Sequence, residues 1–325
     1  MNNATEILED FKCLLEMNTS DSDIAPSDPR SRRMRRAISS IYEATAAESS
    51  KGEIWNWGVH DETLAEELNR LAPDLTEFGT DGFSEQLYLL AVRDCPIPLD
   101  AYDGLTVLEV GCGLGEGLNL LSRFLDAKSM IGLDLAPSAV ARANALLSRG
   151  DSLRFVQGDA EQLPFGDNEI DCVLNIESSH NYPNLSRFFS EVERVLRPGG
   201  VLSHVDLYTR ARYERMERLK RENTGLTWIH SRDISPEVRS SVVRRMAPGS
   251  LFRTSFQRKM EVSGTWFLPR RIGEYFQMNG YGAEFAGVEN DRFIRALKAL
   301  RVLSHLPFPI ESYWHHVAIK PPADQ

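Results

Sequence analysis

The chain has 325 residues, of which 42% are hydrophobic and 26% are charged, and its formal net charge is −10. This composition is typical of a globular protein that buries a sizeable core in one large domain or two. An acidic surface repels phosphate backbones, so we expect no nucleic-acid partner. No stretch approaches the roughly 20 apolar residues of a membrane-spanning helix, so we expect no stable membrane insertion.

The first hundred residues are predicted to be a mainly helical extension. Residues 1–17 mix charged with apolar side chains and lack the apolar run of a signal peptide, which predicts a cytoplasmic protein. The four cysteines are far apart in the chain and are interpreted as free thiols. A polar stretch over residues 18–36 ends in five arginines, Arg30, Arg32, Arg33, Arg35 and Arg36. They indicate either a contact for an anionic substrate or membrane surface, or simply the solvated start of a helix.

From residue 105 onward, short apolar runs alternate with amphipathic segments of helical length. Strands are predicted over 106–110, 129–133, 153–156, 172–176 and 201–207, and helices between them over 118–125, 137–147 and 188–196. Pro198-Gly199-Gly200 is predicted to stop the last of these helices. A helix over 213–222, a strand over 226–230, a mostly helical stretch over 235–305 and a closing strand over 313–319 follow. Alternating strands and helices predict a parallel sheet covered on both faces, with its ligand at the carboxyl ends of the strands.

The most specific motif is a glycine-rich turn, Gly111-Cys112-Gly113-Leu114-Gly115, directly after the first strand. Glycines at such a turn let the backbone bend tightly and approach a ligand closely. Asp134 closes the second strand and Asp159 follows the third. Carboxylates at these two places accept hydrogen bonds from ribose hydroxyls and from an adenine amino group. The pattern therefore predicts a nucleoside pocket.

Two glutamates exclude a pyrophosphate from this pocket. The dinucleotide fingerprint requires Gly or Ala at the position that Glu116 occupies, and Glu109 adds a second carboxylate just before the turn. Both would repel phosphates, but neither would repel a ligand that carries an ammonium and a sulfonium, as S-adenosylmethionine does. A nucleotide-dependent oxidoreductase is therefore disfavoured.

Four segments, 107–117, 132–134, 158–165 and 195–200, resemble the successive motifs of class I methyltransferases. Segments 56–58, 175–183 and 231–234 are similar to the phthiotriol dimycocerosate methyltransferase-like group, which O-methylates lipid or polyketide alcohols. The resemblance implies an α/β, Rossmann-like, doubly wound sheet of seven mostly parallel strands. The implied units are a helical extension or lid (1–100), an S-adenosylmethionine-binding core (101–234), a helical substrate-cover insertion (235–308) and the last strand of the core sheet (309–325).

The resemblance also implies which residues contact the cofactor. They are Glu109, Gly111 and Gly113 at the methionine part, Asp134 and Leu135 at the ribose and adenine edge, Asp159 and Ala160 at the adenine, and Asn175 and Ile176 beside the sulfonium. Trp57 is predicted either to cover the sulfonium by a cation–π contact or to pack among the N-terminal helices.

His180, a few residues past the fourth strand, is the candidate catalytic base, because an alcohol needs a proton acceptor and imidazole exchanges protons near neutral pH. The alternative is that His180 only shapes the pocket. Asp206 shares a strand face with His204 and is a candidate to orient the base or to bind a substrate hydroxyl. The remaining histidines are interpreted as structural. The sequence shows no convincing cluster of carboxylates, so no metal is expected.

We predict an S-adenosylmethionine-dependent O-methyltransferase of a small, lipid-like or polyketide-like acceptor. N- or C-methylation, and a non-methylating binding or cyclase protein of the same fold, stay open, as does a homodimer through the N-terminal helices. The insertion is rich in large apolar side chains, which suits either an apolar substrate pocket or the core of a helical subdomain. These are Trp266, Phe267, Tyr275, Phe276, Met278, Tyr281 and Phe285.

Overall fold

The computed structural model describes residues 19–46, 54–74, 80–222, 225–251, 282–287 and 309–322. Their centre is a seven-stranded sheet in the order β3-β2-β1-β4-β5-β7-β6. The strands are β1 (Thr106–Val110), β2 (Ser129–Asp134), β3 (Leu153–Gln157), β4 (Ile170–Ile176), β5 (Leu196–Tyr208), β6 (Thr227–Asp233) and β7 (Ser312–Ile319). β1 to β5 are parallel, and β7 runs antiparallel between β5 and β6. The predicted sheet of seven mostly parallel strands is confirmed.

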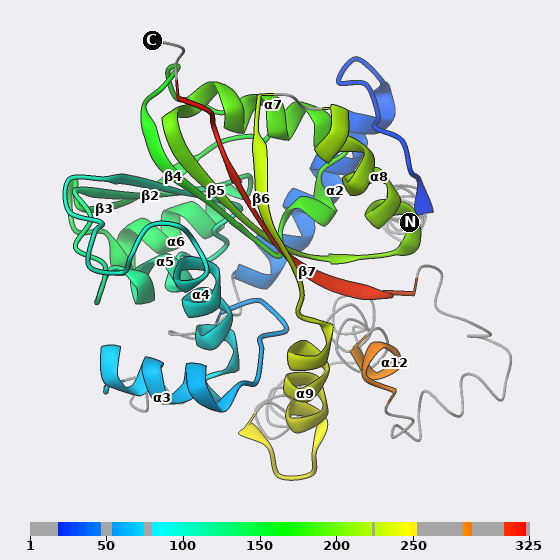
Figure 1. The fold of residues 1–325 in the computed structure, drawn as a ribbon. Helices are drawn as coiled ribbons and strands as arrows, with labels where there is room; N and C mark the ends of the chain where they lie inside the picture. Colours follow the sequence, from blue (N-terminus) through cyan, green and yellow to red (C-terminus); the bar gives the residue numbers. More distant parts are fainter. Residues whose placement is uncertain are drawn as a thin grey trace, which may run out of the picture.

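Helices cover both faces of the sheet (Figure 1). The helices α4 (Phe83–Arg93), α5 (Glu116–Leu121) and α6 (Pro137–Leu147) lie on one face, and α7 (Leu185–Val195) and α8 (Arg210–Glu222) lie on the other. Because successive side chains of a strand point to opposite faces, β1 contributes to two cores. Val107 packs into the core beneath α4 and α5, and Leu108 packs into the core beneath α7.

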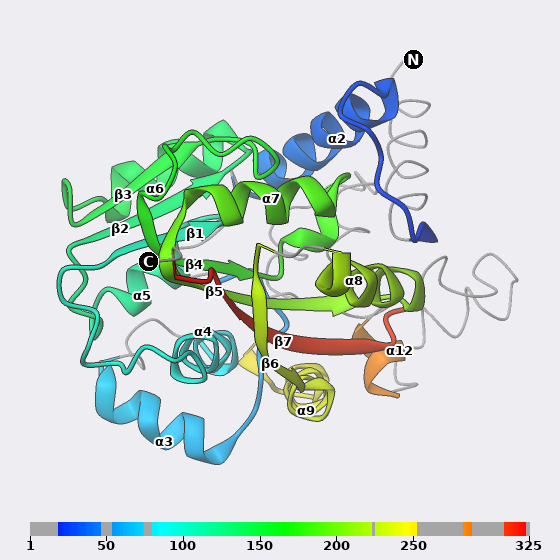
Figure 2. The same cartoon turned by 45° about the horizontal axis from the view of Figure 1, so that its top comes forward.

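Four further helices surround this framework: α2 (Pro29–Ala46), α3 (Glu62–Leu71), α9 (Ser235–Met246) and α12 (Ala283–Ala286). Figure 2 shows α2 beside the helical layer that contains α7. The segment before α2 is fastened there by Asp23, which accepts hydrogen bonds from the Ser186 amide at 3.1 Å and from Arg215 at 2.6 Å. The arginine cluster thus belongs to a helix, as one of its two interpretations held.

Some predicted boundaries were wrong. The helix expected over 118–125 begins two residues earlier and ends at Leu121. Pro198-Gly199-Gly200 does not separate helix from strand but lies within β5, which begins at Leu196 immediately after α7. The reason is tertiary: the Gly199 amide donates to the Lys320 carbonyl at 2.8 Å, so this stretch is paired with the end of β7.

Of the insertion, only residues 235–251 and 282–287 are described, and its predicted aromatic cluster from Trp266 to Tyr281 lies outside them. Phe285 is described, and its ring lies 5.6 Å from that of Trp57. Within the described part of the chain, no helix has the length and apolarity needed to cross a membrane.

Candidate functional site

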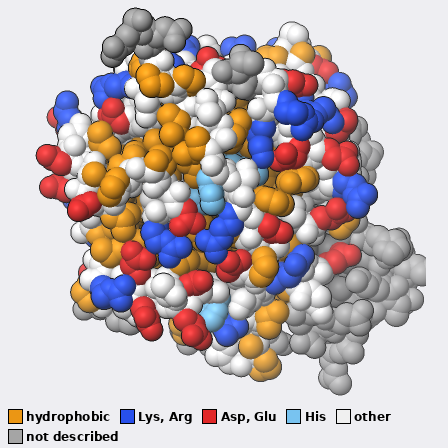
Figure 3. Space-filling model, viewed as in Figure 1, with side chains coloured by type: hydrophobic (Ala, Val, Ile, Leu, Met, Phe, Trp, Pro, Cys, Tyr) orange, Lys and Arg blue, Asp and Glu red, His pale blue; other side chains and the backbone are white. Residues whose placement is uncertain are grey.

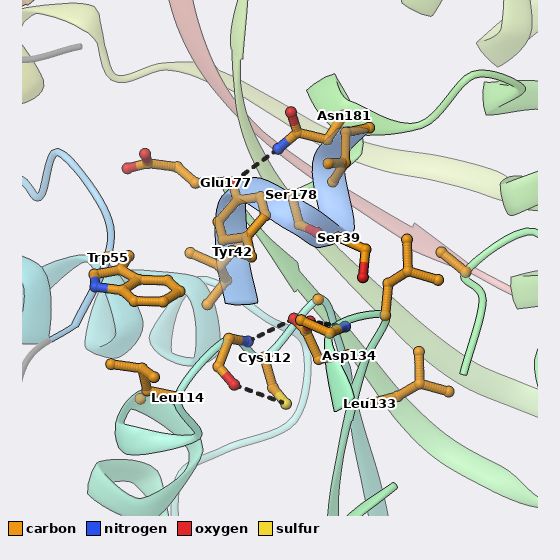
Figure 4. Close-up of a pocket in the computed structure, with 18 of the residues that line it drawn as sticks. Ser39, Tyr42, Trp55, Cys112, Leu114, Leu133, Asp134, Glu177, Ser178 and Asn181 are labelled. Carbon is orange, nitrogen blue, oxygen red and sulfur yellow. Dashed lines mark hydrogen bonds between the residues drawn. The ribbon is translucent and has the colours of Figure 1, made fainter. Parts of the chain in front are cut away.

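A cavity that is partly open to solvent lies where β1, β2 and β4 end (Figure 4). Its position is the one expected for ligands of open α/β sheets. Seven of the ten residues predicted to bind the cofactor line it: Gly111, Gly113, Asp134, Leu135, Asp159, Ala160 and Ile176. Glu109, Asn175 and Trp57 are not part of the lining.

Asp134 holds the glycine turn in place. Its Oδ2 accepts a hydrogen bond from the Gly113 amide at 2.8 Å, and its Oδ1 accepts one from the Ala136 amide at 2.9 Å. Figure 4 shows this carboxylate at the floor of the cavity, facing the turn. Burial raises the pKa of Asp134, and the amide donors of Ala136 and Gly113 oppose that rise. Each oxygen keeps a second lone pair, so the carboxylate can still accept from ligand hydroxyls.

The turn requires glycine at position 111. Gly111 has a φ of +81°, and a Cβ on it would lie 1.8 Å from the Ser178 Oγ. Gly111→Ala therefore combines backbone strain with a steric clash, and we expect it to lower the free energy of unfolding by about 2–5 kcal/mol. Gly104→Ala is the matched control, because Gly104 has a φ of +77° but nothing within 4 Å of a Cβ.

Chemical denaturation of both variants measures the difference. Gly104→Ala is expected to cost only the backbone strain, about 1–2 kcal/mol. The double variant Gly111→Ala/Ser178→Gly should regain part of the loss, since it removes the clashing hydroxymethyl group. Equal losses in the two single variants would show that close packing at the turn is unimportant.

Asp159 lines the cavity, but both of its carboxylate oxygens already have partners in the protein. The Arg35 Nε from α2 lies 2.8 Å from its Oδ2, and the same guanidinium pairs with Glu161. The other oxygen of Asp159 accepts from the Glu161 amide at 2.9 Å. An adenine amino group at this carboxylate would therefore share it with Arg35 or displace Arg35.

Glu109 and Asn175 support the cavity from below. Glu109 is fully buried, and its Oε1 accepts a hydrogen bond of 2.6 Å from Tyr88, which itself lines the cavity. The Glu109 Oε2 has no hydrogen-bond partner among the described residues, and burial raises the pKa of this carboxyl to about 8. The Asn175 amide donates to the Val110 carbonyl at 2.8 Å, which fixes the end of β1 beside β4.

The prediction that Trp57 covers the cofactor is not supported by its position. Trp57 is 3% exposed, and its ring lies 6.4 Å from that of Tyr313 and 5.6 Å from that of Phe285. This position agrees with the other interpretation, in which Trp57 packs in the core. Trp55 lines the cavity instead, with its ring 5.6 Å from that of Tyr42 (Figure 4). Only Asn56 separates the two tryptophans, and burial of Trp57 leaves Trp55 for the cavity.

Glu177, directly after β4, is a lining residue that the sequence analysis did not assign. It has a φ of +46°, which is uncommon for a residue with a side chain and is typical of functional loops. Its Oε1 accepts a 2.6 Å hydrogen bond from the Trp57 amide, and burial raises its pKa to about 7. The positive φ has no signature in the sequence, so only the structure reveals this position.

His180 lies behind the cavity wall, in a short 3₁₀ turn over residues 179–181. Its Nδ1 lies 2.7 Å from the Asp206 Oδ1, and its backbone amide donates to the Asp206 Oδ2 at 2.8 Å. The Ser179 hydroxyl also donates to Asp206, at 2.5 Å. Burial alone would raise the pKa of Asp206, but the imidazole and these donors outweigh it and lower the pKa to about 2.

The ionised Asp206 determines which nitrogen of His180 carries the proton. A carboxylate only accepts hydrogen bonds, so the His180 Nδ1 must donate, and Nε2 keeps its lone pair. That lone pair faces the Asn181 amide nitrogen at 3.0 Å, which also donates to the Tyr42 hydroxyl at 3.0 Å (Figure 4). Asn181 and Tyr42 line the cavity, so a ligand hydroxyl reaches Nε2 only where the Asn181 amide now lies.

Comparison with known proteins shows which proteins this chain resembles. The family described as "Methyltransferase domain" matches residues 108–203. Over 135 residues the chain is 42% identical to a phthiotriol/phenolphthiotriol dimycocerosates methyltransferase of Mycobacterium leprae, covering 42% of this chain and 49% of that protein. Over 180 residues it is 38% identical to a fatty-acid O-methyltransferase of Mycolicibacterium smegmatis, covering 52% and 63%. The chain thus spans from about half to slightly less than two thirds of the length of these relatives.

Solved structures share the fold at low sequence identity. The cyclase SpnF is 18% identical with a TM-score of 0.55, over 93% of this chain and 100% of that one. Geranyl diphosphate C-methyltransferase from Streptomyces coelicolor A3(2), solved with S-adenosyl-L-homocysteine, is 16% identical with a TM-score of 0.53, over 91% and 100%. The fold is therefore shown, whereas the reaction differs among its members. Residues 108–203 of this chain thus match a methyltransferase domain, and they lie in a sheet of the kind that these solved structures share.

Proposed function

We propose that the protein transfers a methyl group from S-adenosylmethionine to a hydroxyl of a small, lipid-like molecule, with His180 as the proton acceptor. The observation that carries this proposal is the hydrogen-bond geometry at Asp206, which leaves the Nε2 lone pair of His180 one side chain away from the cavity. A bound alcohol that displaces the Asn181 amide would meet a ready acceptor for its proton.

The cavity suits S-adenosylmethionine, the methyl donor in this proposal. The glycine turn leaves no Cβ between backbone and ligand, and Asp134 presents free lone pairs at the end of β2. Beneath the turn, the partnerless Oε2 of Glu109 is the kind of buried acceptor that a cationic ligand satisfies. Phosphates would find the carboxylates of Glu116 and Asp134 close to the turn.

The cofactor supplies an activated methyl group on its sulfonium. The contribution of the chain is to position the acceptor in line with that group, to exclude water and to take up the proton. Asp206 stabilises the imidazolium that forms when His180 accepts the proton. Arg212, 3% exposed, donates to the Ser179 carbonyl at 2.9 Å and thereby holds the His180 turn against α8.

A lipid-like acceptor is supported by the lining and by the relatives. Ile38, Ile54 and Trp55 give the cavity an apolar wall on the side of α2. The relatives named above act on dimycocerosates and fatty acids according to their names. The homodimer and the cytoplasmic location stay predictions.

The direct test incubates the protein with isotope-labelled S-adenosylmethionine and separate panels of lipid alcohols, fatty acids and amines. We expect a product that gains one CH₂ group on oxygen, identified by mass spectrometry. A product methylated on nitrogen or carbon would show that the acceptor group is not a hydroxyl. Cofactor binding without any labelled product from the panels or from a cell extract would favour a non-methylating protein.

Proton uptake and release provide an independent prediction. The pKa of Glu109 is raised to about 8 and that of Glu177 to about 7 by burial, so at pH 7 both carboxyls are substantially protonated. A ligand that carries an ammonium favours their ionised forms, so binding of S-adenosylhomocysteine should release protons. The affinity should therefore rise with pH up to about pH 8 and level off above it.

Calorimetry at pH 7 in buffers of different ionisation enthalpy measures this release. Glu109→Gln and Glu177→Gln each remove one titrating carboxyl. The variant that releases fewer protons on binding identifies the carboxyl that faces the ammonium. Glu169→Gln, at an exposed residue, is the control and should leave the release unchanged. Binding without proton release in the unaltered protein would contradict the prediction.

A further inference from the structure

Two histidines and an aspartate gather on the sheet outside the cavity. Asp94 follows α4, His230 lies on β6 and His315 lies on β7. One ligand atom of each lies within 4.8 Å of the others, and none of the three lines the cavity. Figure 3 shows histidine, basic and acidic side chains together on this face, over β6 and the end of α4.

The proton position on His315 is fixed by its surroundings. The Ser203 hydroxyl donates to the Ala91 carbonyl at 2.7 Å, so its oxygen is left to accept from the His315 Nε2 at 2.9 Å. The His315 Nδ1 therefore carries a lone pair. His315 is fully buried, and this nitrogen has no hydrogen-bond partner among the described residues.

This lone pair points toward the other two members of the cluster. The His315 Nδ1 lies 3.9 Å from the Asp94 Oδ2, which is too long for a hydrogen bond. The His230 ring lies 5.7 Å from that of His315, and the His230 Nε2 is buried and also lacks a partner in the described ranges. Two adjacent imidazole nitrogens without partners are costly unless something binds them.

The charges nearby leave room for a cation. Arg232 and Arg93 donate to Asp94, each at 3.1 Å. Each arginine also has a second carboxylate: Arg232 pairs with Glu237 at 2.6 Å, and Arg93 lies 3.7 Å from Glu67. The two arginines are thus balanced by the two glutamates, so the formal charge of Asp94 remains.

We propose that Asp94, His230 and His315 form a zinc site that joins the end of α4 to the two antiparallel strands. Two imidazoles and one carboxylate are a ligand set that suits Zn²⁺ and does not suit Mg²⁺ or Ca²⁺, which prefer oxygen ligands. Ser203 orients His315 from behind, as is usual for metal-binding histidines. In a tetrahedral zinc site, ligand atoms lie about 3.3 Å apart, so the side chains must close by about an ångström.

The inference contrasts with the expectation of no metal from the sequence. The three ligands are far apart in the chain and match no zinc spacing, so only the pairing of β6 with β7 and the packing of α4 bring them together. The site does not depend on the proposed methyl transfer, because none of its members contacts the cavity.

The test uses the full-length, tag-free protein, stripped with a chelator and titrated with ZnCl₂ by calorimetry. We expect one Zn²⁺ per chain, a higher unfolding temperature with Zn²⁺, and no response to MgCl₂. His230→Ala, at a partly exposed position, should weaken Zn²⁺ binding at least about 100-fold, and Ser203→Ala about 10–100-fold. His315→Gln is the complementary ligand variant.

His316→Gln is the matched control, because His316 is buried on the opposite face of β7 and hydrogen-bonds Ser231 at 2.9 Å. It should keep the Zn²⁺ affinity of the unaltered protein. The proposal is overturned if the unaltered protein binds no Zn²⁺, or if His230→Ala binds Zn²⁺ as tightly and in the same stoichiometry. Methyl transfer can be present in either case, so the two proposals fail separately.

Discussion

Asp134→Ala is expected to weaken the binding of S-adenosylhomocysteine by about 10²–10⁴-fold, because hydrogen bonds to a charged group contribute about 1.5–3 kcal/mol each and at least two would be lost. One holds the Gly113 amide at 2.8 Å, and the others would be made to the ribose hydroxyls. The side chain therefore acts twice, on the shape of the turn and on the ligand. Calorimetric titration measures the loss.

Asp126→Ala, at an exposed aspartate between α5 and β2, is the control and should bind as the unaltered protein does. Asp134→Asn should fall between the two, because the amide keeps one acceptor oxygen. Asp159→Ala is a poorer test, since it also releases Arg35 from its ion pair. Unchanged affinity in Asp134→Ala would rule out this cavity as the nucleoside site.

Removal of the proposed base is expected to affect turnover and not cofactor binding. His180→Ala should lower kcat about 10²–10⁴-fold, the usual contribution of a positioned base. Asp206→Asn should have a similar effect, because an amide at position 206 no longer enforces the proton on Nδ1 of His180. Steady-state kinetics with the identified acceptor, alongside calorimetry with S-adenosylhomocysteine, separates the two effects.

His60→Gln is the control, because His60 does not line the cavity and packs edge-on against Phe83. It should retain kcat within a few-fold. If His180→Ala also retained kcat, the imidazole would not be the base. An amine acceptor, which needs less help with its proton, would then replace the hydroxyl in the proposal.

Sequence periodicity sufficed for the sheet because its signals are local. Each strand of the core contains an apolar run beside a helix-length amphipathic segment. Each lies within a few residues of its predicted bounds except β5, which begins at Leu196 and not at Val201. The glycine turn could also be predicted, because glycine is the residue that adopts a positive φ most readily, and Gly111 and Gly113 both do so. Glu177 is the opposite case: its φ is positive although it is not a glycine, so its residue type does not predict this conformation.

Contacts between distant segments could not be predicted. Nothing in a run of five arginines distinguishes Arg35, which meets Asp159 only because α2 packs beside α6. In the same way, Trp57 was predicted to cover the cofactor whereas Trp55 lines the cavity, because tertiary packing decides which of the two is buried. The placement of Asn181 between His180 and the cavity is likewise a consequence of loop geometry.

The antiparallel β7 joins two ladders at once, pairing His315 with Val205 on one side and with Arg232 on the other. Until this stretch of chain arrives, β5 presents an open row of amides and carbonyls, and β6 has no neighbour within the described sheet. Such long-range pairing is slow, and bare strand edges invite association with other chains. We therefore expect nascent or refolding molecules to be most prone to aggregation just before β7 docks.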